Sequence, residues 1–408
     1  MRRVPLLSGS RVVLVPTSDD DVVVRPPAPP DRVVDVEAAV RDALRFPLSG
    51  PPLAALVTRG GRATILVEPA ALPLPGAPQD ARQSAIAVAI AELEGCGVPN
   101  EHQTILVAGG LGRRFGQRDL ERLLSPPQAR SFRGRVVVHD AEDETLVPVA
   151  GGARIHPVLV ETDLVLAVTA AETVLHGGPG ALIAACDAAT VRRAAEADSL
   201  LEAAGSPAWA LGLELEAAVA ARAALAGVSL VLDLPRLTGT FRGYPDDPAQ
   251  VSRLARSPLR AAFSLLPHTL RRDLLGGQGR RMDATGAFAG PPSVAHAEAL
   301  LRGIALRGTR LEEPVDALVV GVPWIGPHVP REPLNPITVA AVALGLALRL
   351  RRDAFPIQPD GSLVLIHPLT RSFVHGTQAP YATMFNALRT ERGHERLGEA
   401  ERAAASDE

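Results

Sequence analysis

The chain has no lysine: its 408 residues include 42 basic side chains, and every one of them is arginine. A guanidinium keeps its charge and does not act as an amine nucleophile, whereas a lysine amine can form a covalent link to a cofactor or substrate. The sequence therefore excludes any reaction that attaches a cofactor to a lysine side chain. A GC-rich genome favours arginine codons, but it supplies no substitute for a catalytic amine.

Other scarce features narrow the class of protein further. Aromatic residues make up only 3% of the chain, so its cores must be built from aliphatic side chains. The two cysteines, Cys96 and Cys186, are too few for a disulfide framework. The formal net charge of −3 lacks the basic excess of a nucleic-acid-binding protein, so we expect no nucleic-acid partner.

Long apolar runs are also missing. The longest uncharged apolar stretch, residues 336–348, is too short to cross a bilayer, and the two arginines near the N-terminus are not followed by the apolar segment of a signal peptide. We therefore expect no membrane partner and a cytoplasmic location. The histidines and cysteines show no spacing that is typical of a metal site, so no metal ligands are predicted.

What the sequence does contain is a repeated order of a short β-branched run, a loop and an amphipathic stretch rich in alanine and leucine. This order is typical of α/β proteins with parallel sheets. We predict two Rossmann-like α/β domains joined by a helical connection, with boundaries at residues 1–205, 206–226 and 227–408. The strands are expected at residues 64–67, 104–108, 135–139, 163–168, 229–232, 237–241, 315–322 and 362–366. The glycine-rich segment Gly276–Pro292 is predicted to be a loop.

Ligands of open α/β sheets bind at the carboxyl ends of the strands, and side chains suited to binding follow the first two predicted strands. Glu68 follows the first. Gly110 and Arg113 follow the second, in a glycine-rich turn that could bind a phosphate through its backbone N–H groups. The turn does not complete the Gly-x-Gly-x-x-Gly fingerprint of a dinucleotide site, so a tight turn is the favoured interpretation. Arg113, planar and permanently charged, is the predicted clamp for a carboxylate or phosphate.

Two histidines of the N-terminal half are candidate acid/base groups. His139 ends a predicted strand beside Asp140, but neighbouring residues on a strand point to opposite faces, so Asp140 is not expected to orient the imidazole. His176 precedes a helix in a loop with Gly178, where N–H groups could hold an anionic ligand. A structural histidine in the first case and a flexible turn in the second are the alternative interpretations.

The third candidate is His367, which follows the last predicted strand. Arg371 comes four residues later, and a histidine and an arginine together could bind a carboxylate substrate. A capped loop docked on the sheet would explain the same residues.

Several segments resemble, in their order, the nickel-dependent lactate racemase (LarA-like) family. They are Thr104–Arg113, Val138–Asp140, Glu161–Val168, Gly177–Gly180, Ala184–Thr190, Val315–Val320, Asn335-Pro336 and His367–Phe373. The resemblance implies two α/β domains with a site in the cleft between them. It also implies inversion of a 2-hydroxy acid by hydride transfer to a nickel pincer nucleotide, which a thioamide ties to a lysine while two histidines alternate as acid and base.

The sequence departs from the family at the positions that would carry this chemistry. The family's Asp-x-Thr-Arg-Pro run falls on Glu68–Pro73, its first acid/base histidine on Gly112, its second near Thr173 and its cofactor lysine near Gly180. His176 lies close enough to Thr173 to be a substitute. Covalent attachment of the cofactor is impossible here, and the resemblance leaves the cofactor of this chain unknown.

Three functional hypotheses follow. The first is a divergent family member that binds a small anionic ligand or a family partner between its domains without catalysis. The second is an active 2-hydroxy-acid racemase or epimerase with a rearranged site and a cofactor held without a covalent link. The third is a nucleotide-dependent enzyme on the same scaffold. The lost residues favour the first, and a homo-oligomer is compatible with each.

Overall fold

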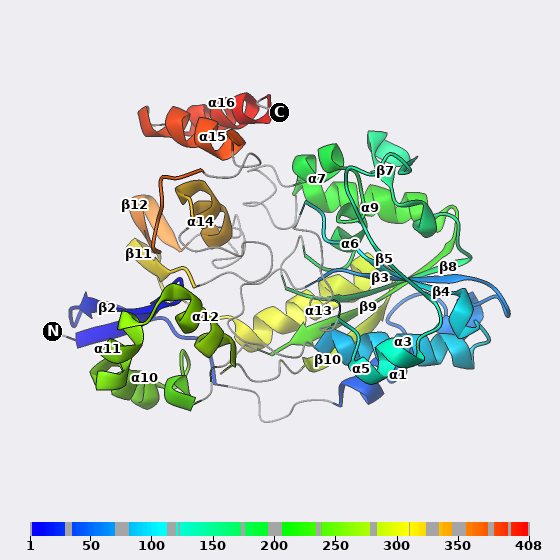
Figure 1. Cartoon of the computed structure of the whole chain (residues 1–408), viewed down its shortest axis with the longest axis horizontal. Helices are drawn as coiled ribbons and strands as arrows, with labels where there is room; N and C mark the ends of the chain where they lie inside the picture. The colour runs from blue at the N-terminus through cyan, green and yellow to red at the C-terminus, as the bar shows by residue number, and fades with distance from the viewer. Residues whose placement is uncertain are drawn as a thin grey trace.

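The largest element of the protein is a six-stranded sheet with the strand order β10-β9-β8-β3-β4-β5 (Figure 1). The computed structural model describes residues 2–28, 35–69, 81–111, 120, 123–172, 176–194, 206–233, 237, 239–277, 284–309, 311–323, 334–344, 356–373, 379–390 and 393–406. The strands of the sheet are β3 (Ala63–Val67), β4 (Gln103–Val107), β5 (Arg135–Val138), β8 (Leu164–Ala170), β9 (Ala224–Leu232) and β10 (Ala284–Gly290). All neighbouring pairs are parallel except β9 and β10, which are antiparallel. The protein thus has a mixed α/β fold around a mainly parallel sheet.

The central strands β3 and β8 are apolar except for one threonine each, because helices cover both faces of the sheet. Every residue of β3 and β8 is buried. A strand covered on both sides needs apolar side chains at consecutive positions, which explains the unbroken aliphatic runs. In register, Val67 lies opposite both Val107 and Val168. The carboxyl ends of β3, β4 and β8 therefore lie side by side at one edge, called the carboxyl edge below.

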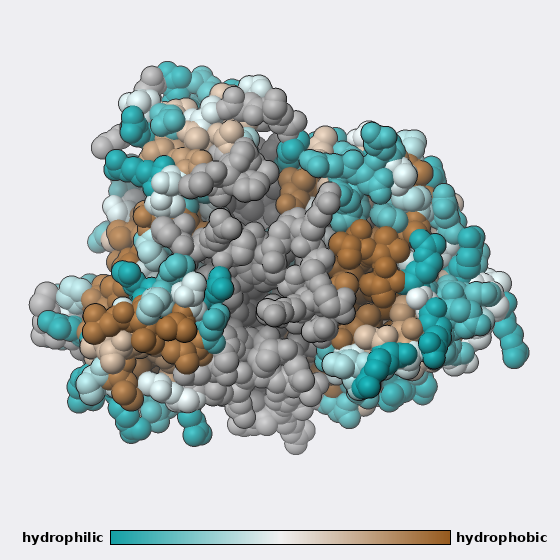
Figure 2. All heavy atoms as spheres, in the orientation of Figure 1, coloured by the Kyte–Doolittle hydropathy of each residue, from teal (hydrophilic) through white to brown (hydrophobic). Residues whose placement is uncertain are grey.

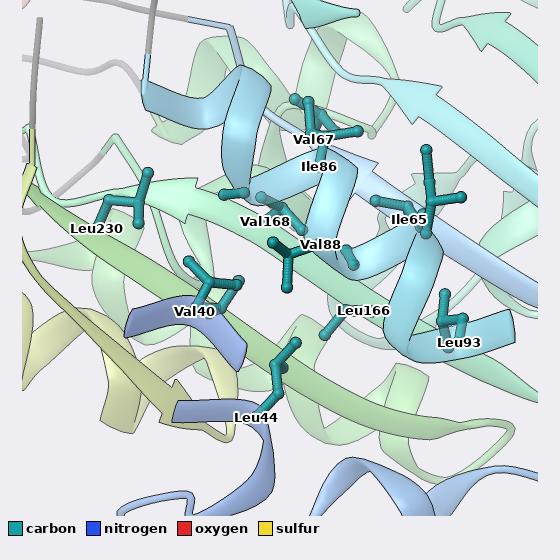
Figure 3. Packing of buried hydrophobic residues seen from close by; sticks show 14 of the residues in the cluster. Val40, Leu44, Ile65, Val67, Ile86, Val88, Leu93, Leu166, Val168 and Leu230 are labelled. Atoms are coloured by element: carbon teal, nitrogen blue, oxygen red, sulfur yellow. The ribbon is translucent and has the colours of Figure 1, made fainter. Parts of the chain in front are cut away.

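One face of the sheet is covered by α1 (Val36–Arg45) and α3 (Ala81–Gly95). Figure 3 shows Val40 of α1 and Ile86 of α3 packed over Ile65, Leu166 and Leu230. Alternate residues of a strand point to the same face, so this core takes every second residue of each strand.

The opposite face is covered by α6 (Gly180–Ile183) and α9 (Pro207–Ala220), with Leu182 and Leu215 packed on Leu66 and Val165. Further along the sheet, α13 (Pro292–Arg307) packs on β9 and β10.

The N-terminal hairpin does not join the main sheet. β1 (Arg2–Ser8) and β2 (Arg11–Thr17) form an antiparallel pair that packs with α10 (Pro248–Arg256), α11 (Pro258–Leu265) and α12 (His268–Gly277). The hairpin also meets β11 (Val315–Gly321), because the Gly9 N–H donates to the Val322 carbonyl at 2.7 Å. β11 pairs in parallel with β12 (Ile357–Ile366). The first residues of the chain thus lie beside its C-terminal half (Figure 1).

The helices α10–α12 carry apolar side chains on their outer surface as well as in their core. Figure 2 shows apolar surface over this group, which includes the exposed Leu259, Leu265, Leu270 and Leu274.

The remaining elements are shorter or lie outside the two groups above. They are α2 (Leu53–Leu56), α5 (Pro126–Ser131), α7 (Ala188–Ala194), α14 (Pro336–Val342), α15 (Ala379–Thr390), α16 (His394–Ala405), the strands β6 (Val147–Pro148) and β7 (Arg154–Ile155), and the 3-10 turns Asn100–His102, Ala150–Gly152, Pro157–Leu159 and Gly239–Phe241. The helices α15 and α16 pack against each other near the C-terminus (Figure 1). Of the helices that the structure describes, none is long and apolar enough to cross a membrane.

The prediction of a mainly parallel α/β sheet is confirmed, but three details are wrong. The main sheet does not end before residue 227, because β9 pairs with β8 and carries β10 at its other edge. The predicted loop Gly276–Pro292 contains β10, whose glycines do not prevent pairing along β9. The predicted strand Leu237–Phe241 ends instead in a 3-10 turn over Gly239–Phe241. Where the chain divides into domains stays a prediction.

Candidate functional site

The carboxyl edge of the main sheet carries a buried carboxyl group next to a glycine-rich loop. Glu68 comes directly after β3, and only 7% of its surface is exposed. Its Oε2 accepts a hydrogen bond of 2.6 Å from the Gly177 N–H, in the loop between β8 and α6. Removal from water and, to a lesser extent, the neighbouring Glu172 raise the pKa of the Glu68 carboxyl to about 8, although Arg82 and the Gly177 N–H act in the opposite direction.

A buried ion pair lies next to Glu68. Arg82, in the first turn of α3, places Nη2 3.0 Å from Oε1 of Glu172, which follows β8. The two side chains are 2% and 1% exposed, so the pair is almost fully removed from water. Arg307 of α13 lies on the same side, and its guanidinium donates to the Ala171 carbonyl at 3.2 Å. Burial lowers the pKa of Arg307, although Glu172 acts to raise it.

The glycine-rich loop is held by main-chain geometry that only glycine adopts readily. Gly177 and Gly178 have φ of 112° and 53°, in the left-handed region. A Cβ on Gly178 would lie 2.3 Å from the Cβ of His296, and one on Gly177 would lie 2.7 Å from the imidazole of the same residue. His296, fully buried on α13, stacks in turn on Trp209 with 6.0 Å between ring centroids. The loop is thus wedged between the sheet and α13.

The backbone donors of this loop are already in use. The Gly178 N–H donates to Oγ1 of Thr169 at 3.0 Å, and the Gly177 N–H donates to Glu68. The helix that follows, α6, has only four residues, too few for a substantial dipole at its N-terminus. In this conformation the expected anion-binding role of Gly178 through its N–H is therefore unsupported. His176 is half-buried at the start of the loop.

His139 lies in a different environment, on the opposite side of β4. The imidazole is buried, and Nε2 donates a 2.8 Å hydrogen bond to the Cys186 carbonyl. In the described part of the chain, Nδ1 of His139 has no hydrogen-bond partner. Burial lowers the pKa of His139. Its ring also packs edge-on against the ring of another buried histidine, His156, with centroids 5.9 Å apart.

Asp140 belongs to a turn beside His139, and its charge acts to raise the pKa of that histidine against the larger effect of burial. Its Oδ1 accepts the Glu142 N–H at 3.1 Å, as in an Asx-turn. The turn borders an open depression of about 380 Å³, lined by side chains of both signs, among them Asp143, Asp187 and Arg154. The mixture of charges gives this depression no preference for an anion.

The other predicted site residues are spread over the structure. His367 follows β12 and donates from Nδ1 to the Val322 carbonyl at 3.0 Å, within the β11–β12 unit, and Arg371 is exposed beyond it. Gly110 forms a tight turn with φ of 55°, in which its N–H donates to the Ala184 carbonyl at 3.0 Å. Arg113, together with Gly112 and Thr173, lies outside the described residues. Among the predicted site residues, the described contacts therefore bring Glu68 to the loop of Gly177 and Gly178. His139 and His367 instead form hydrogen bonds elsewhere, to the carbonyl groups of Cys186 and Val322.

Three residues of the carboxyl edge were missed: Arg82, Glu172 and His296. Glu172 could have been found, because it follows a predicted strand that is aliphatic over Leu164–Val168, and a charged side chain that is buried beside such a strand needs a partner. Arg82 and His296 lie on helices and give no such indication, because only the tertiary fold brings them to the strand ends.

The geometry defines a mixed α/β protein with a buried charged cluster at the carboxyl edge of a mainly parallel sheet. Residues 8–176 match the lactate racemase N-terminal domain, a range that includes β3, β4, β5, β8 and the residues Glu68 and Glu172. This part of the chain belongs to the lactate racemase N-terminal domain (LarA) family.

One solved structure supports the same fold at low sequence identity. The lactate racemase apoprotein of Thermoanaerobacterium thermosaccharolyticum aligns with 13% identity and a TM-score of 0.50, over 78% of this chain and 66% of that one. A protein from Thermotoga maritima aligns with 11% identity and a TM-score of 0.44, over 69% of this chain and 62% of that one. The chain therefore spans slightly less than two thirds of either structure. No curated protein matches the sequence.

The residues of this chain do not fit the lysine-linked nickel pincer nucleotide that the family resemblance implies. Gly180, near which the resemblance places the cofactor lysine, is buried at the start of α6, and its N–H donates to the Gly177 carbonyl at 3.0 Å. Among the described residues, no group of three or more histidine, cysteine or acidic side chains is arranged to hold a metal ion.

Proposed function

We propose that this protein is a divergent LarA-family member that binds a small anionic ligand at the carboxyl edge of its main sheet and does not racemise 2-hydroxy acids by the lysine-linked route. The observation that carries the proposal is the absence of lysine from all 408 residues. The thioamide link that the family resemblance implies needs a lysine amine, and arginine does not replace it.

The charges at the carboxyl edge support an anionic ligand. Arg82 and Arg307 bring two positive charges to this edge, and the Glu172 carboxylate, which pairs with Arg82, offsets one of them. A Glu68 carboxyl with a pKa of about 8 is mostly neutral at pH 7, so it adds little negative charge there. A carboxylate or phosphate is the ligand class that guanidinium groups bind best.

The arrangement of the histidines argues against inversion at carbon. Two-base inversion needs an acid and a base on opposite sides of one carbon, each within hydrogen-bond reach. His139 and His367 instead use one ring nitrogen each on the carbonyl groups of Cys186 and Val322. The described geometry supplies no facing pair of imidazoles.

The second hypothesis, an active racemase with a cofactor held without a covalent link, has one observation in its favour. The family match covers residues 8–176, which includes His139 and reaches His176. His176 is the residue on which this alternative depends, because it belongs to the loop at the carboxyl edge.

A paired measurement tests both hypotheses. Purified protein is titrated with D-lactate and, separately, with inorganic phosphate in a calorimeter. Further samples are incubated with D-lactate, with and without added nickel pincer nucleotide, and assayed for L-lactate. We expect saturable binding without L-lactate, and R82M should weaken binding while E101Q, which removes an exposed charge elsewhere, should not. Formation of L-lactate that disappears in H176A would establish the racemase instead. Absence of binding to both D-lactate and phosphate would reject the anion-binding proposal.

A further inference from the structure

The titratable carboxyl group of Glu68 is hydrogen-bonded directly to the glycine-rich loop at the carboxyl edge. The bond of 2.6 Å from the Gly177 N–H crosses 109 positions of sequence, and both residues are buried. The second bond of the loop, from the Gly178 N–H to Thr169, involves a hydroxyl that does not titrate. Of the two side chains bonded to Gly177 and Gly178, only Glu68 changes charge with pH.

We propose that Glu68 is a proton-operated latch: its neutral carboxyl holds the loop Gly177–Gly180 against the sheet, and loss of its proton releases the loop. The proposal concerns the loop itself and does not depend on which ligand the protein binds.

Burial is the main reason why the ionised form of Glu68 is disfavoured in the closed loop, and the nearby carboxylate of Glu172 adds to it. Glu172, after β8, places a second carboxylate close enough to raise the pKa of Glu68. Arg82, from α3, faces both acids but forms its ion pair at 3.0 Å with Glu172. From α13, Arg307 interacts with Glu172 and also with Asp233 after β9. Two carboxylates beside one shared arginine repel each other in a region of low dielectric.

The remaining titratable groups at the loop are histidines. His296 packs its ring against Gly177 and Gly178 from α13, and His176 is the residue before Gly177.

The direction and the pH range follow from linkage. In the closed loop the pKa of Glu68 is about 8, whereas a carboxyl released to water returns to its ordinary value of 4.5. Opening therefore releases a proton at pH values between these two. In that range the ratio of open to closed loop rises about tenfold for each unit of pH, and it levels off above the pKa of the closed form.

Amide hydrogen exchange of the intact protein, resolved by NMR, tests the latch. Protection factors of Gly177 and Gly178, corrected for the intrinsic pH dependence of exchange, are measured from about pH 5 to about pH 9. We expect protection to fall by about tenfold per pH unit and to level off near the upper end. E68Q keeps an oxygen acceptor without a titrating proton, so its protection should be independent of pH. E101Q, which removes an exposed acid, should behave like the unchanged protein.

Two further readouts keep the proposal testable if E68Q folds poorly. In the unchanged protein, the carboxyl ¹³C shift of Glu68 should titrate far above the ordinary range of a glutamate. T169V should lower the protection of Gly178 at every pH and leave the pH dependence of Gly177 intact. A pH-independent Gly177 in the unchanged protein, an equal slope in E68Q, or a Glu68 carboxyl that titrates near its ordinary pKa would each overturn the latch.

Discussion

Arg82 and Glu172 form an ion pair of 3.0 Å that is almost completely shielded from water, and it ties α3 to the carboxyl end of β8. Arg82 belongs to a helix that otherwise contributes aliphatic side chains to the core. A buried pair of this kind contributes little compared with apolar residues of equal volume, but removal of one partner leaves a charge without its counter-ion. The pair is therefore a point at which single and double substitutions should differ sharply.

We predict that E172A lowers the free energy of unfolding by about 3–5 kcal/mol, because the Arg82 guanidinium loses its buried counter-charge. R82M/E172L, which replaces both charges by apolar side chains, should recover most of that loss. Urea unfolding followed by circular dichroism measures both. The exposed pair Arg396 and Glu399 provides the control, since E399A should change stability by less than about 1 kcal/mol. A double variant as unstable as E172A would show that the ion pair itself, and not its burial, determines stability.

The buried histidines should destabilise the fold in mild acid. Burial, and to a lesser extent the charge of His139, lowers the pKa of His156 to about 4. A depressed histidine pKa means that the unfolded chain binds the proton first, so stability is complete above about pH 6.5 and declines as the pH falls toward 4. The Nδ1 atom of His156 also accepts the Val158 N–H at 3.3 Å, as an N-cap.

The variant H156N separates the two roles. Asparagine keeps an N-cap acceptor but has no proton to gain, so the acid-side decline should become shallower, by no more than about 3 kcal/mol at pH 4. Urea unfolding at a series of pH values measures the slope. His139 contributes a decline of the same sign, because burial lowers its pKa too, and so some slope should remain. An unchanged slope in H156N would mean that His156 does not titrate in this range.

The sequence predicted those parts of the structure that local patterns control. The aliphatic runs at β3, β4 and β8 identified the core of the sheet, and the rule that ligands meet strand ends led to Glu68. Prediction from the sequence failed where tertiary contacts determine the conformation. β10 contains two glycines in seven residues and was predicted to be a loop, but pairing along β9 decides its conformation. Likewise, Arg82 and Glu172 are 90 positions apart, and no local sequence pattern predicts an ion pair between them.

The glycine-rich loop should tolerate no side chain at Gly178. An alanine there would combine the cost of a left-handed backbone, φ of 53°, with a Cβ placed 2.3 Å from His296 and 2.9 Å from the Pro292 carbonyl. We expect G178A to lose more than about 2 kcal/mol of stability. Gly50 is a matched control: it has φ of 81°, but no atom lies within 4 Å of the position of its Cβ. G50A should therefore show the backbone cost alone, about 1 kcal/mol.

Thermal unfolding of the two variants makes this comparison directly. If G178A and G50A were equally stable, the loop would have room to move away from His296, and the wedge between sheet and α13 would not exist. G178A/H296A removes the obstructing ring but not the Pro292 carbonyl, so it should recover only part of the loss.

The last prediction concerns the cofactor. No residue of this chain offers a lysine amine, so the protein purified from its own host should carry no covalent nucleotide adduct, whatever its metal supply. Intact-mass spectrometry should give the mass of the polypeptide alone, and metal analysis should find far less than one nickel per chain. Growth with and without added nickel is the control, because a nickel-dependent change in mass would reveal an attachment by another residue. A nucleotide-sized mass addition together with about one nickel per chain would contradict the proposal, and peptide mapping would then identify the residue that replaces the missing lysine.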